Sequence, residues 1–451
     1  MKRSIFSIFT LLVVVGLLLS ACGSAAPTEA PAEPAAPAPA EPAAPAEEEP
    51  AATEEPAMVE ETVVIGFTSS LTGAQEVSSK RQVNGFVLWM NQVNEAGGVT
   101  LSDGTVVKFD YKTYDDESNG DRVQELYTRL IGEDNADFLI SPYSSGLTSA
   151  ASIVAEQNGK VMITTGAADD ATYQTGNTSL FQLYTPASLY MSSTVDMLKQ
   201  LDPEAKVALV HESDKFSTGV AEGIKPYLEA NGFEIVLEEG YASDTADFGP
   251  IVNKISGSGA TVLLGGGHYN DGTALARAIY DRNIGLKFAY LLVAPADTKF
   301  PELGDAALGI ATSSQWELAA THTEAEAANL GMEWFGPTGE DFAAAYEAAY
   351  GDPPTYHVAG GYAAGLVLQK AVTDADTVDP EAVKAALNAM NLMTFYGAIQ
   401  FDTSEDAHGL QIAHKMVVAQ WQKDDAGELV RVIIAPADVA TNDPLYPIPA
   451  Q

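Results

Sequence analysis

Hydroxyl-bearing loops follow three apolar runs in the first half of the chain, at residues 69–73, 143–148 and 164–168. In the second loop, Ser144 and Ser145 directly precede a stretch with helical periodicity. Free backbone N–H groups and the helix dipole at such a position favour an anion, for example a carboxylate. Capping of the helix without a ligand explains Ser144 alone equally well. Because the other two loops have the same character, the set favours a binding site for a small ligand.

The middle of the chain carries polar and aromatic residues that would face these loops across a cleft. They are Phe216, His268, Tyr269, Asp271, Asp297 and Trp316. A carboxylate of Asp271 or Asp297 would pair with a ligand ammonium, although each residue also stands where it would cap a following helix. Trp316 would either stack on a ligand or pack within a hinge. The two groups together predict a polar site with aromatic walls.

Each catalytic motif that the sequence suggests lacks a residue that the motif requires. His211-Glu212 lacks the second histidine of a helical HExxH zinc site, and the six histidines of the chain are scattered without pairing at four-residue spacing. No G-x-S-x-G nucleophile elbow and no phosphate-binding P-loop occur in the sequence. The glycines at 265–267 suggest a dinucleotide turn, but Asn270 stands at the position of its third glycine. We therefore expect a protein that is not an enzyme and has no cofactor.

One acidic loop has the spacing of a calcium site. Asp115, Glu117 and Asn119 are placed as in the opening of an EF-hand loop, with Gly120 after them. Leu126, however, occupies the position of the bidentate glutamate. Capping of the following helix is the stronger interpretation of these residues, so we expect no metal site here.

The amino-acid composition further narrows the possible classes of function. The 451 residues include 23 Lys and Arg against 62 Asp and Glu, which gives a formal net charge of −39. Binding to DNA or RNA needs clustered basic side chains, and docking on anionic lipid needs a basic face, so the charge disfavours both. The length exceeds that of one ordinary domain and favours two lobes.

The amino terminus has the features of a secretory signal peptide. Lys2 and Arg3 precede an apolar run at 5–19, and the only cysteine of the sequence, Cys22, follows Leu-Ser-Ala. This stretch resembles the lipobox of bacterial lipoproteins, in which the cysteine is lipidated and becomes the mature amino terminus. An ordinary signal peptide with an incidental cysteine is the alternative. The resemblance implies a lipoprotein signal peptide at 1–21 and a lipid anchor at Cys22.

Residues 24–57 hold almost only Ala, Pro, Glu and Thr, with nine prolines, eight glutamates and no Lys or Arg. Proline fixes φ and like charges repel each other, so the composition predicts an extended tether. The sequence thus predicts a lipidated cysteine and disordered tether at 22–57. We expect this tether to hold a globular module at the outer side of the cell membrane, in the periplasm or at the cell surface.

After the tether, short β-rich runs alternate with helical patterns, and the alternation restarts after Pro186. This order predicts an α/β fold with two units of parallel, doubly wound sheet. Ligands of such folds bind in the crevice beyond the carboxyl ends of the strands. The expected strands are at 63–67, 106–114, 138–140, 161–163, 207–210, 233–237, 262–264, 288–293, 395–401, 416–421 and 430–434. The expected helices include those at 83–93, 120–131, 147–157, 189–201, 248–255, 273–282, 341–350, 356–371 and 380–389.

Several short motifs occur in the same order as in a known family. They are Leu71-Thr72-Gly73, Gly85, Leu88-Trp89, the run at 93–99, Asp115-Asp116 and Tyr143-Ser144-Ser145. Over about residues 63–421, the chain resembles the branched-chain amino acid (Leu/Ile/Val) binding proteins of ABC importers and their amide- and urea-binding relatives. The ordered set with its spacing carries the resemblance, since no single motif is diagnostic.

The resemblance implies a type I periplasmic-binding fold, in which two Rossmann-like lobes with parallel sheets are joined by three hinge crossovers and close on a ligand. The crossovers are expected near 184–186, 312–314 and 413–415. The predicted lobes are an N-terminal lobe of 58–185 plus 314–414 and a C-terminal lobe of 186–313 plus 415–451.

The resemblance also implies roles for individual residues. By position, Ser144 and Ser145 match the family residues that hold the ligand carboxylate. Gly166 supplies a backbone contact from the loop that also contains Ala167, and Phe216 matches an aromatic position of the pocket.

Three positions depart from the leucine-binding pattern. Ala168 replaces a threonine that contacts the carboxylate and the amine, and Ser78 replaces a tyrosine that packs on the ligand side chain. Ala296 falls near the glutamate that pairs with the α-ammonium. Asp271 or Asp297 would have to supply that charge instead; otherwise the ligand is an amide or a carboxylate without the amine.

The predicted function is that of the solute-binding component of an ABC importer, a monomer that captures a small polar ligand and presents it to a membrane permease. A receptor module of the same fold that feeds a signalling partner is the alternative. An extracellular hydrolase is disfavoured by the absent catalytic motifs. A DNA-binding regulator of this fold would need a helix-turn-helix and a cytosolic address.

Overall fold

The alternation of strands and helices continues through the whole part of the chain that the computed structural model describes, residues 59–449. The predictions of a signal peptide, of lipidated Cys22 and of a tether lie outside these residues. None of the helices within 59–449 is both long enough and apolar enough to cross a membrane.

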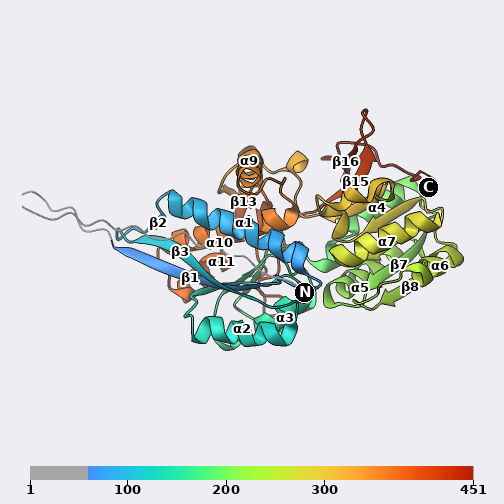
Figure 1. Cartoon of the computed structure of the whole chain (residues 1–451). Coiled ribbons are helices and arrows are strands. Elements are labelled where there is room, and N and C mark those ends of the chain that lie inside the picture. The colour runs from blue at the N-terminus through green and yellow to red at the C-terminus, as the bar shows by residue number, and fades with distance from the viewer. Residues whose placement is uncertain (1–58, 450–451) are drawn as a thin grey trace, which may run out of the picture. The chain divides into compact units, whose positions relative to one another are not determined.

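The first sheet has six strands in the order β2-β3-β1-β4-β5-β6. Its strands are β1 (Glu60–Ser69), β2 (Val99–Thr100), β3 (Val106–Asp115), β4 (Phe138–Ile140), β5 (Met162–Thr164) and β6 (Leu180–Gln182). All neighbours pair in parallel except β2 and β3. Helices α1 (Glu76–Glu95) and α10 (Tyr356–Ala375) cover one face, and α2 (Gly120–Gly132) and α3 (Ser145–Gln157) cover the other (Figure 1). We call this sheet with its helices the first lobe.

Burial on both faces explains why β4 and the middle of β1 are nearly continuous apolar runs. Val63, Ile65 and Phe67 alternate along β1 into the core beneath α1 and α10. On the opposite face, Leu139 and Met162 pack with the apolar sides of α2 and α3. The period of two along a strand therefore divides the side chains between two cores.

Glycines let α1 and α10 approach each other closely. A Cβ added to Gly361 would lie 2.0 Å from the backbone oxygen of Gln82, and one added to Gly85 would lie 2.0 Å from the backbone oxygen of Val358. A Cβ at Gly365 would overlap the ring of Trp89. This contact fixes the position of the amino-terminal end of α10, which carries part of the site described below.

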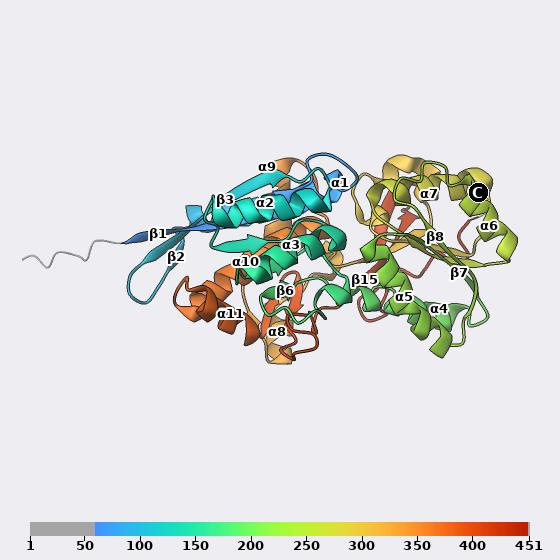
Figure 2. The same cartoon turned by 90° about the horizontal axis from the view of Figure 1, so that it is seen from below.

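The second sheet has seven strands in the order β16-β15-β11-β10-β9-β7-β8. Its strands are β7 (Lys206–Glu212), β8 (Glu234–Tyr241), β9 (Val262–Gly266), β10 (Phe288–Leu291), β11 (Ile310–Ser314), β15 (Val417–Lys423) and β16 (Leu429–Ala435). The strands pair in parallel from β8 to β11, whereas β15 and β16 are antiparallel at one edge. Helices α4 (Ser192–Leu201) and α5 (Lys215–Ala230) lie on one face, and α6 (Gly249–Ser258) and α7 (Tyr269–Arg282) lie on the other (Figure 2). This sheet with its helices is the second lobe.

A third, small sheet corrects one predicted element. The strand expected at 395–401 is present but shorter, as β14 (Gly397–Ile399), and it pairs with an unpredicted antiparallel strand, β13 (Leu392–Thr394), which lies beside β12 (Glu333–Trp334). The turn between them is made of Phe395 and Tyr396, both fully buried. Aromatic residues are not a recognised signal for a two-residue hairpin turn, so the sequence did not reveal the first strand of the hairpin.

Short helices complete the chain. The remaining α-helices are α8 (Glu324–Leu330), α9 (Gly339–Tyr350) and α11 (Pro380–Asn388). Single turns of 3₁₀-helix are η1 (Asp170–Thr172), η2 (Ala187–Leu189), η3 (Ala294–Ala296) and η5 (Leu318–Ala320), and η4 (Phe300–Ala307) is longer.

Three segments connect the two sheets, and hydrogen bonds join these segments to each other. Thr185, which follows β6, donates its N–H to Gln315 Oε1 at 3.1 Å. Gln315 follows β11, and its backbone oxygen lies 3.0 Å from Nε2 of His414, which precedes β15. Gln315 Nε2 also donates to the hydroxyl of Tyr190 at 2.9 Å. The three connections thus form one bonded cluster between the sheets.

Side chains of the acidic loop with calcium-like spacing accept hydrogen bonds from nearby backbone N–H groups. Asn119 caps α2 by accepting the N–H of Arg122 at 3.0 Å. Asp115 accepts the backbone N–H groups of Leu71 and Glu117, each at 2.9 Å. Asn119 therefore has the capping role that the sequence favours, whereas Asp115 joins this loop to the loop after β1.

Candidate ligand-binding cleft

A small cavity lies where the strand ends of the two lobes meet. Its free volume is about 10 Å³, room for roughly one water molecule. The lining residues come from both lobes, and they are Tyr143, Gly166, Ala168, Tyr184, Tyr190, Phe216, His268, Val293 and Tyr356. Strand ends, helix starts and the connecting segments converge at this point, as expected for the crevice of a doubly wound fold.

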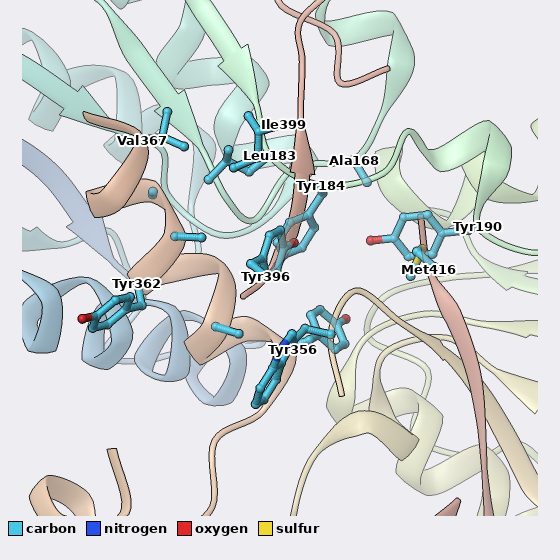
Figure 3. Close-up of a cluster of buried hydrophobic side chains, with 14 of the residues drawn as sticks. Ala168, Leu183, Tyr184, Tyr190, Tyr356, Tyr362, Val367, Tyr396, Ile399 and Met416 are labelled. Carbon is cyan, nitrogen blue, oxygen red and sulfur yellow. The ribbon is translucent and has the colours of Figure 1, made fainter. Parts of the chain in front are cut away.

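Aromatic side chains from both lobes fill most of the crevice. Phe216 of the second lobe packs with ring centroids 5.2 Å from Tyr190 and 5.6 Å from His268. In the first lobe, Tyr184 lies 5.8 Å from Tyr356. Figure 3 shows the hydroxyl of Tyr190 pointing from the second-lobe side toward Tyr184. The walls of the cleft are therefore mainly aromatic, with polar atoms at the edges of the rings.

A chain of three polar side chains crosses the cavity. Tyr143 of the first lobe has its hydroxyl 3.1 Å from His268 Nδ1, and His268 Nε2 lies 2.9 Å from Asp214 Oδ2. Burial lowers the pKa of His268, but Tyr143 and the carboxylates of Asp214 and Glu212 outweigh burial and raise that pKa well above its usual value. We therefore describe His268 as an imidazolium that donates to Tyr143 and to Asp214.

Asp214 is stabilised in its charged form. Burial raises its pKa, but His268 and the hydrogen bonds from Ser217 outweigh burial and lower the pKa to about 2. Asp214 also caps α5, since its carboxylate accepts the N–H groups of Phe216 and Ser217. The negative charge of this residue thus positions both His268 and the start of α5.

On the first-lobe side, several buried polar atoms have no hydrogen-bond partner among residues 59–449. They are Gln82 Oε1, Thr165 Oγ1, the Tyr184 hydroxyl and both ring nitrogens of His357. His357 stacks on Tyr356 at 4.0 Å and packs edge-on against Tyr143 at 5.3 Å. Buried polar groups normally find a partner, so this group marks a place where a polar ligand or water gains hydrogen bonds.

The two serines predicted to hold a carboxylate lie beside the cavity at the start of α3. Ser145 is 1% exposed, and its Oγ accepts the N–H groups of Ala168 at 3.1 Å and Asp169 at 3.2 Å. Ser144 is the N-cap residue, but its side chain makes no capping hydrogen bond. Ser145 therefore shapes the loop that contains Gly166, and a contact of either serine with a ligand stays a prediction.

The other predicted residues divide between the cavity and its surroundings. Gly166, Ala168, Phe216 and His268 line the cavity. Ala167 is buried behind it and accepts a hydrogen bond from Gln182 Nε2 at 3.2 Å.

Tyr269 and Asp271 lie in the first turn of α7, which begins four residues earlier than the pattern predicts, directly after His268. Asp271 is hydrogen-bonded to the hydroxyl of Tyr241. Trp316 does not line the cavity. It packs edge-on against Phe342 at 5.4 Å and Phe395 at 5.8 Å within the first lobe.

Two ion pairs join the lobes beside the cavity. Arg81 of α1 has Nε 3.4 Å from Asp297 Oδ2, and its Nη2 donates to Thr298 Oγ1 at 3.0 Å. Lys215 of α5 has Nζ 3.3 Å from Asp169 Oδ2 and donates to Ser149 Oγ at 3.0 Å. We call these pairs the Arg81 latch and the Lys215 latch. Asp297 is thus held by Arg81 in this arrangement of the lobes.

Sequence reasoning missed five cavity residues, which are Tyr143, Tyr184, Tyr190, Val293 and Tyr356. Tyr184 and Tyr190 flank the first connection between the sheets, and Tyr356 opens a helix that lies far along the chain. Val293 has φ of +51°, a strained value for a β-branched residue, which no sequence pattern reveals. A signal was available only for Tyr143, which belongs to a recognised motif.

A larger hollow of about 820 Å³ lies on the second lobe between α4 and the segment after β16. Its lining includes Asp196, Gln200 and Pro436, all from one lobe, and it is open to solvent. Size alone does not identify a binding site. The smaller cavity is the stronger candidate because both lobes line it and unpartnered polar atoms surround it.

The geometry does not resemble a hydrolytic triad. His268 bonds a phenol and a carboxylate, and among residues 59–449 no serine or cysteine side chain hydrogen-bonds to it. The arrangement is suited to binding: aromatic walls, an imidazolium, and hydrogen-bonding groups without partners.

Comparison with known proteins agrees with this architecture. The family model described as periplasmic binding protein matches residues 62–427. The chain belongs to this family. A leucine-, isoleucine-, valine-, threonine- and alanine-binding protein of Pseudomonas aeruginosa is 23% identical over 371 residues, which cover 82% of this chain and 92% of the relative. The resemblance found in the sequence is thereby confirmed.

Solved structures of periplasmic binding proteins share the fold. The branched-chain amino acid substrate-binding protein LivJ of Streptococcus pneumoniae, in complex with isoleucine, matches with a TM-score of 0.68 at 19% identity, over 83% of this chain and 100% of that one. A solute-binding protein of Rhodopseudomonas palustris in complex with 3,4-dihydroxybenzoic acid matches with a TM-score of 0.70 at 20% identity, over 85% of this chain and 99% of that one. The predicted type I periplasmic-binding fold is confirmed.

Proposed function

We propose that this periplasmic binding protein is the extracytoplasmic solute-binding component of an ABC importer. It captures a small polar molecule between its lobes and delivers it to a membrane permease. The ligand is an amino acid, an amide or a small carboxylate. The lipid anchor predicted at Cys22 keeps the protein, a monomer, beside the permease.

The observation that carries the proposal is the cavity lined by both lobes, with Tyr143 and His268 hydrogen-bonded across it. A ligand that contacts both walls binds the closed arrangement more tightly than an open one, and this difference in affinity drives closure. The two latches add contacts that form when the lobes approach. Relatives with the same fold bind isoleucine or a dihydroxybenzoic acid, which supports a small molecule with a carboxylate.

Thermal-shift and calorimetric screening tests the proposal. The panel contains amino acids, their amides and small aliphatic and aromatic carboxylates. A true ligand at about 100 times its Kd stabilises the protein by roughly 2.7 kcal/mol. If no compound of these classes shifts the melting temperature or gives a heat of binding, the proposed ligand class is wrong.

A further inference from the structure

Four uncharged side chains of the first lobe lie beside the cavity with hydrogen-bonding atoms that have no partner among residues 59–449. They are Gln82, Thr165, Tyr184 and His357, each at most 2% exposed. They belong to α1, to the loop after β5, to the segment after β6 and to the first turn of α10. A buried polar atom without a partner is costly, so a group of them from four separate segments indicates a place that a ligand completes.

Two glycines show how closely three of these side chains approach the same loop. A Cβ added to Gly166 would lie 2.4 Å from Gln82 Oε1. A Cβ added to Gly360 would lie 2.7 Å from Thr165 Oγ1 and 3.5 Å from the hydroxyl of Tyr184. Gly166 directly follows Thr165 and lines the cavity, as Tyr184 does. The unpartnered oxygens therefore gather around one loop of the cavity wall.

His357 adds two nitrogens to this group. Its ring stacks on Tyr356 at 4.0 Å and packs edge-on against Tyr143 at 5.3 Å, and both tyrosines line the cavity. Burial, then the positive charges of His268 and Arg81, lower the pKa of His357 to about 3. The ring is therefore neutral at pH 7, and it has one nitrogen that donates and one that accepts a hydrogen bond.

The two cations that act on His357 are already paired with carboxylates. Arg81 Nε lies 3.4 Å from Asp297 and its Nη1 lies 3.1 Å from Asp352. His268 is bonded to Asp214 at 2.9 Å. A charged ligand group placed among the four neutral side chains would lose its hydration without gaining a free opposite charge. An uncharged group fits this part of the cavity wall better.

We propose that these four side chains form a subsite for a hydroxyl group of the ligand. This inference rests on the proposed function and narrows its ligand class to hydroxylated amino acids and hydroxylated carboxylates. Thr165, Tyr184 and His357 each have a hydrogen to donate. Gln82 Oε1 only accepts, and Gln82 Nε2 is bonded to the backbone oxygen of Ser141 at 2.8 Å. A hydroxyl has two lone pairs and one hydrogen, which match this excess of donors, whereas a carboxamide brings two hydrogens.

Calorimetric titration with matched pairs of compounds tests the subsite, since the two members of a pair differ only in one hydroxyl group. The pairs are L-homoserine with L-2-aminobutyrate, 5-hydroxypentanoate with pentanoate, and 4-hydroxybenzoate with benzoate. The hydroxylated member of at least one pair should bind about tenfold more tightly or better, because its partner compound leaves the buried polar atoms unpaired.

Two variants remove the polar atoms and keep the shape of the subsite. Thr165→Val removes one hydroxyl, and His357→Phe removes both ring nitrogens. Each should reduce the preference to less than about threefold by weakening only the hydroxylated compound. Thr165→Val should not lower the melting temperature of the unligated protein, because the hydroxyl has no partner among the described residues.

Thr194→Val is the matched control. Thr194 of α4 is fully buried, and its hydroxyl also has no partner within residues 59–449, but it does not line the cavity. The control should therefore keep the preference of the wild-type protein for the hydroxylated compound.

Three outcomes would overturn the inference. Equal binding of both members in every pair excludes a hydroxyl subsite. A preference that persists in both variants places the hydroxyl group elsewhere, and equal weakening of both members assigns the replaced side chains a structural role. In these cases amino acids or carboxylates still bind, so the proposed function stands. If no compound binds, with or without a hydroxyl group, the proposed function fails as well, so the two failures are distinguishable.

Discussion

The two walls of the cleft differ in how they are charged. The first-lobe wall carries neutral groups without partners, among them the Tyr184 hydroxyl and the imidazole of His357. Burial, then His268 and Arg81, lower the pKa of His357 to about 3, so this ring is neutral at pH 7. The second-lobe wall carries the charged groups Asp214, His268 and Glu212. Hydrogen-bonding capacity and charge are thus divided between the lobes, and a ligand must approach both walls to satisfy them.

The walls also differ in what holds them in place. The first wall depends on backbone contacts without side chains, where glycines of α1 and α10 meet. The second wall depends on electrostatics at strand ends, where Asp214 caps α5 and orients His268. We therefore expect the first wall to be sensitive to volume and the second to be sensitive to charge and pH.

The largest expected effect is on the first wall. Gly361→Ala places a methyl group 2.0 Å from the backbone oxygen of Gln82, which cannot move without shifting α1. We expect a loss of about 1–3 kcal/mol in the free energy of unfolding. Gly257→Ala is the matched control, because Gly257 lies in α6 of the second lobe with no atom within 4 Å of its added Cβ. It should gain about 0.5–1 kcal/mol in denaturant unfolding. Similar values for both variants would contradict the proposed difference between the lobes.

Because acidic side chains are buried on the second-lobe side of the cleft, the stability of the protein should depend on pH. The pKa of Asp271 is raised from 3.8 to about 6, so its ionisation destabilises the folded state above pH 4 and most strongly above pH 6. Asp271→Asn should therefore stabilise the protein by about 1–3 kcal/mol at pH 7–8, and the gain should vanish near pH 4. Unfolding at a series of pH values measures this change.

Asp281→Asn is the control for that series, since Asp281 lies exposed on the same helix. Its effect should stay within about 0.5 kcal/mol at every pH. A gain for Asp271→Asn that persists at pH 4 would show that ionisation is not its cause.

The two serines at the start of α3 should behave differently. Ser145→Ala leaves the buried N–H groups of Ala168 and Asp169 without an acceptor and should cost about 1–3 kcal/mol of stability. Ser144→Ala removes no capping hydrogen bond and should change stability by less than about 0.5 kcal/mol. If Ser144 contacts the ligand, its variant will instead weaken binding. Chemical denaturation and calorimetry on the same samples separate these roles, and equal stability of the two variants would contradict the assignment.

The smallest effect concerns the contact between the walls. Lys215→Met removes the Lys215 latch, which is a partly exposed pair and contributes about 0.5–1 kcal/mol to closure. Ligand affinity should fall about two- to fivefold, and less at high salt. Lys225→Met is the control, because Lys225 pairs with Glu238 inside the second lobe. An equal loss of affinity in the control would exclude a role of the Lys215 latch in closure.

The sequence predicted the fold and much of the second wall for clear physical reasons. Strands with both faces buried and helices with strong caps leave local patterns, and residues placed directly after strands, such as Phe216 and His268, must lie at the edge of a sheet. The hairpin at Phe395 and Tyr396 was missed because its turn has no glycine or asparagine.

The first wall was only partly predictable. Tyr356 and His357 reach the cleft through the contact of α10 with α1, which depends on tertiary packing of helices more than 250 residues apart in sequence. Glu212 was recognised only as part of an incomplete zinc motif, because its place beside Asp214 and His268 is a property of three-dimensional packing. Neither a close backbone approach nor a cluster of charged groups from separate strand ends has a pattern in the sequence.

Hydrogen exchange of the protein with and without a binding compound tests the central claim most directly. The account predicts that one ligand slows exchange in both walls together, in residues 143–146 and 166–169 of the first lobe and in residues 212–217 and 266–269 of the second. Protection confined to one lobe, or centred on residues 434–444 beside the larger hollow, would show that the cleft is not the ligand site.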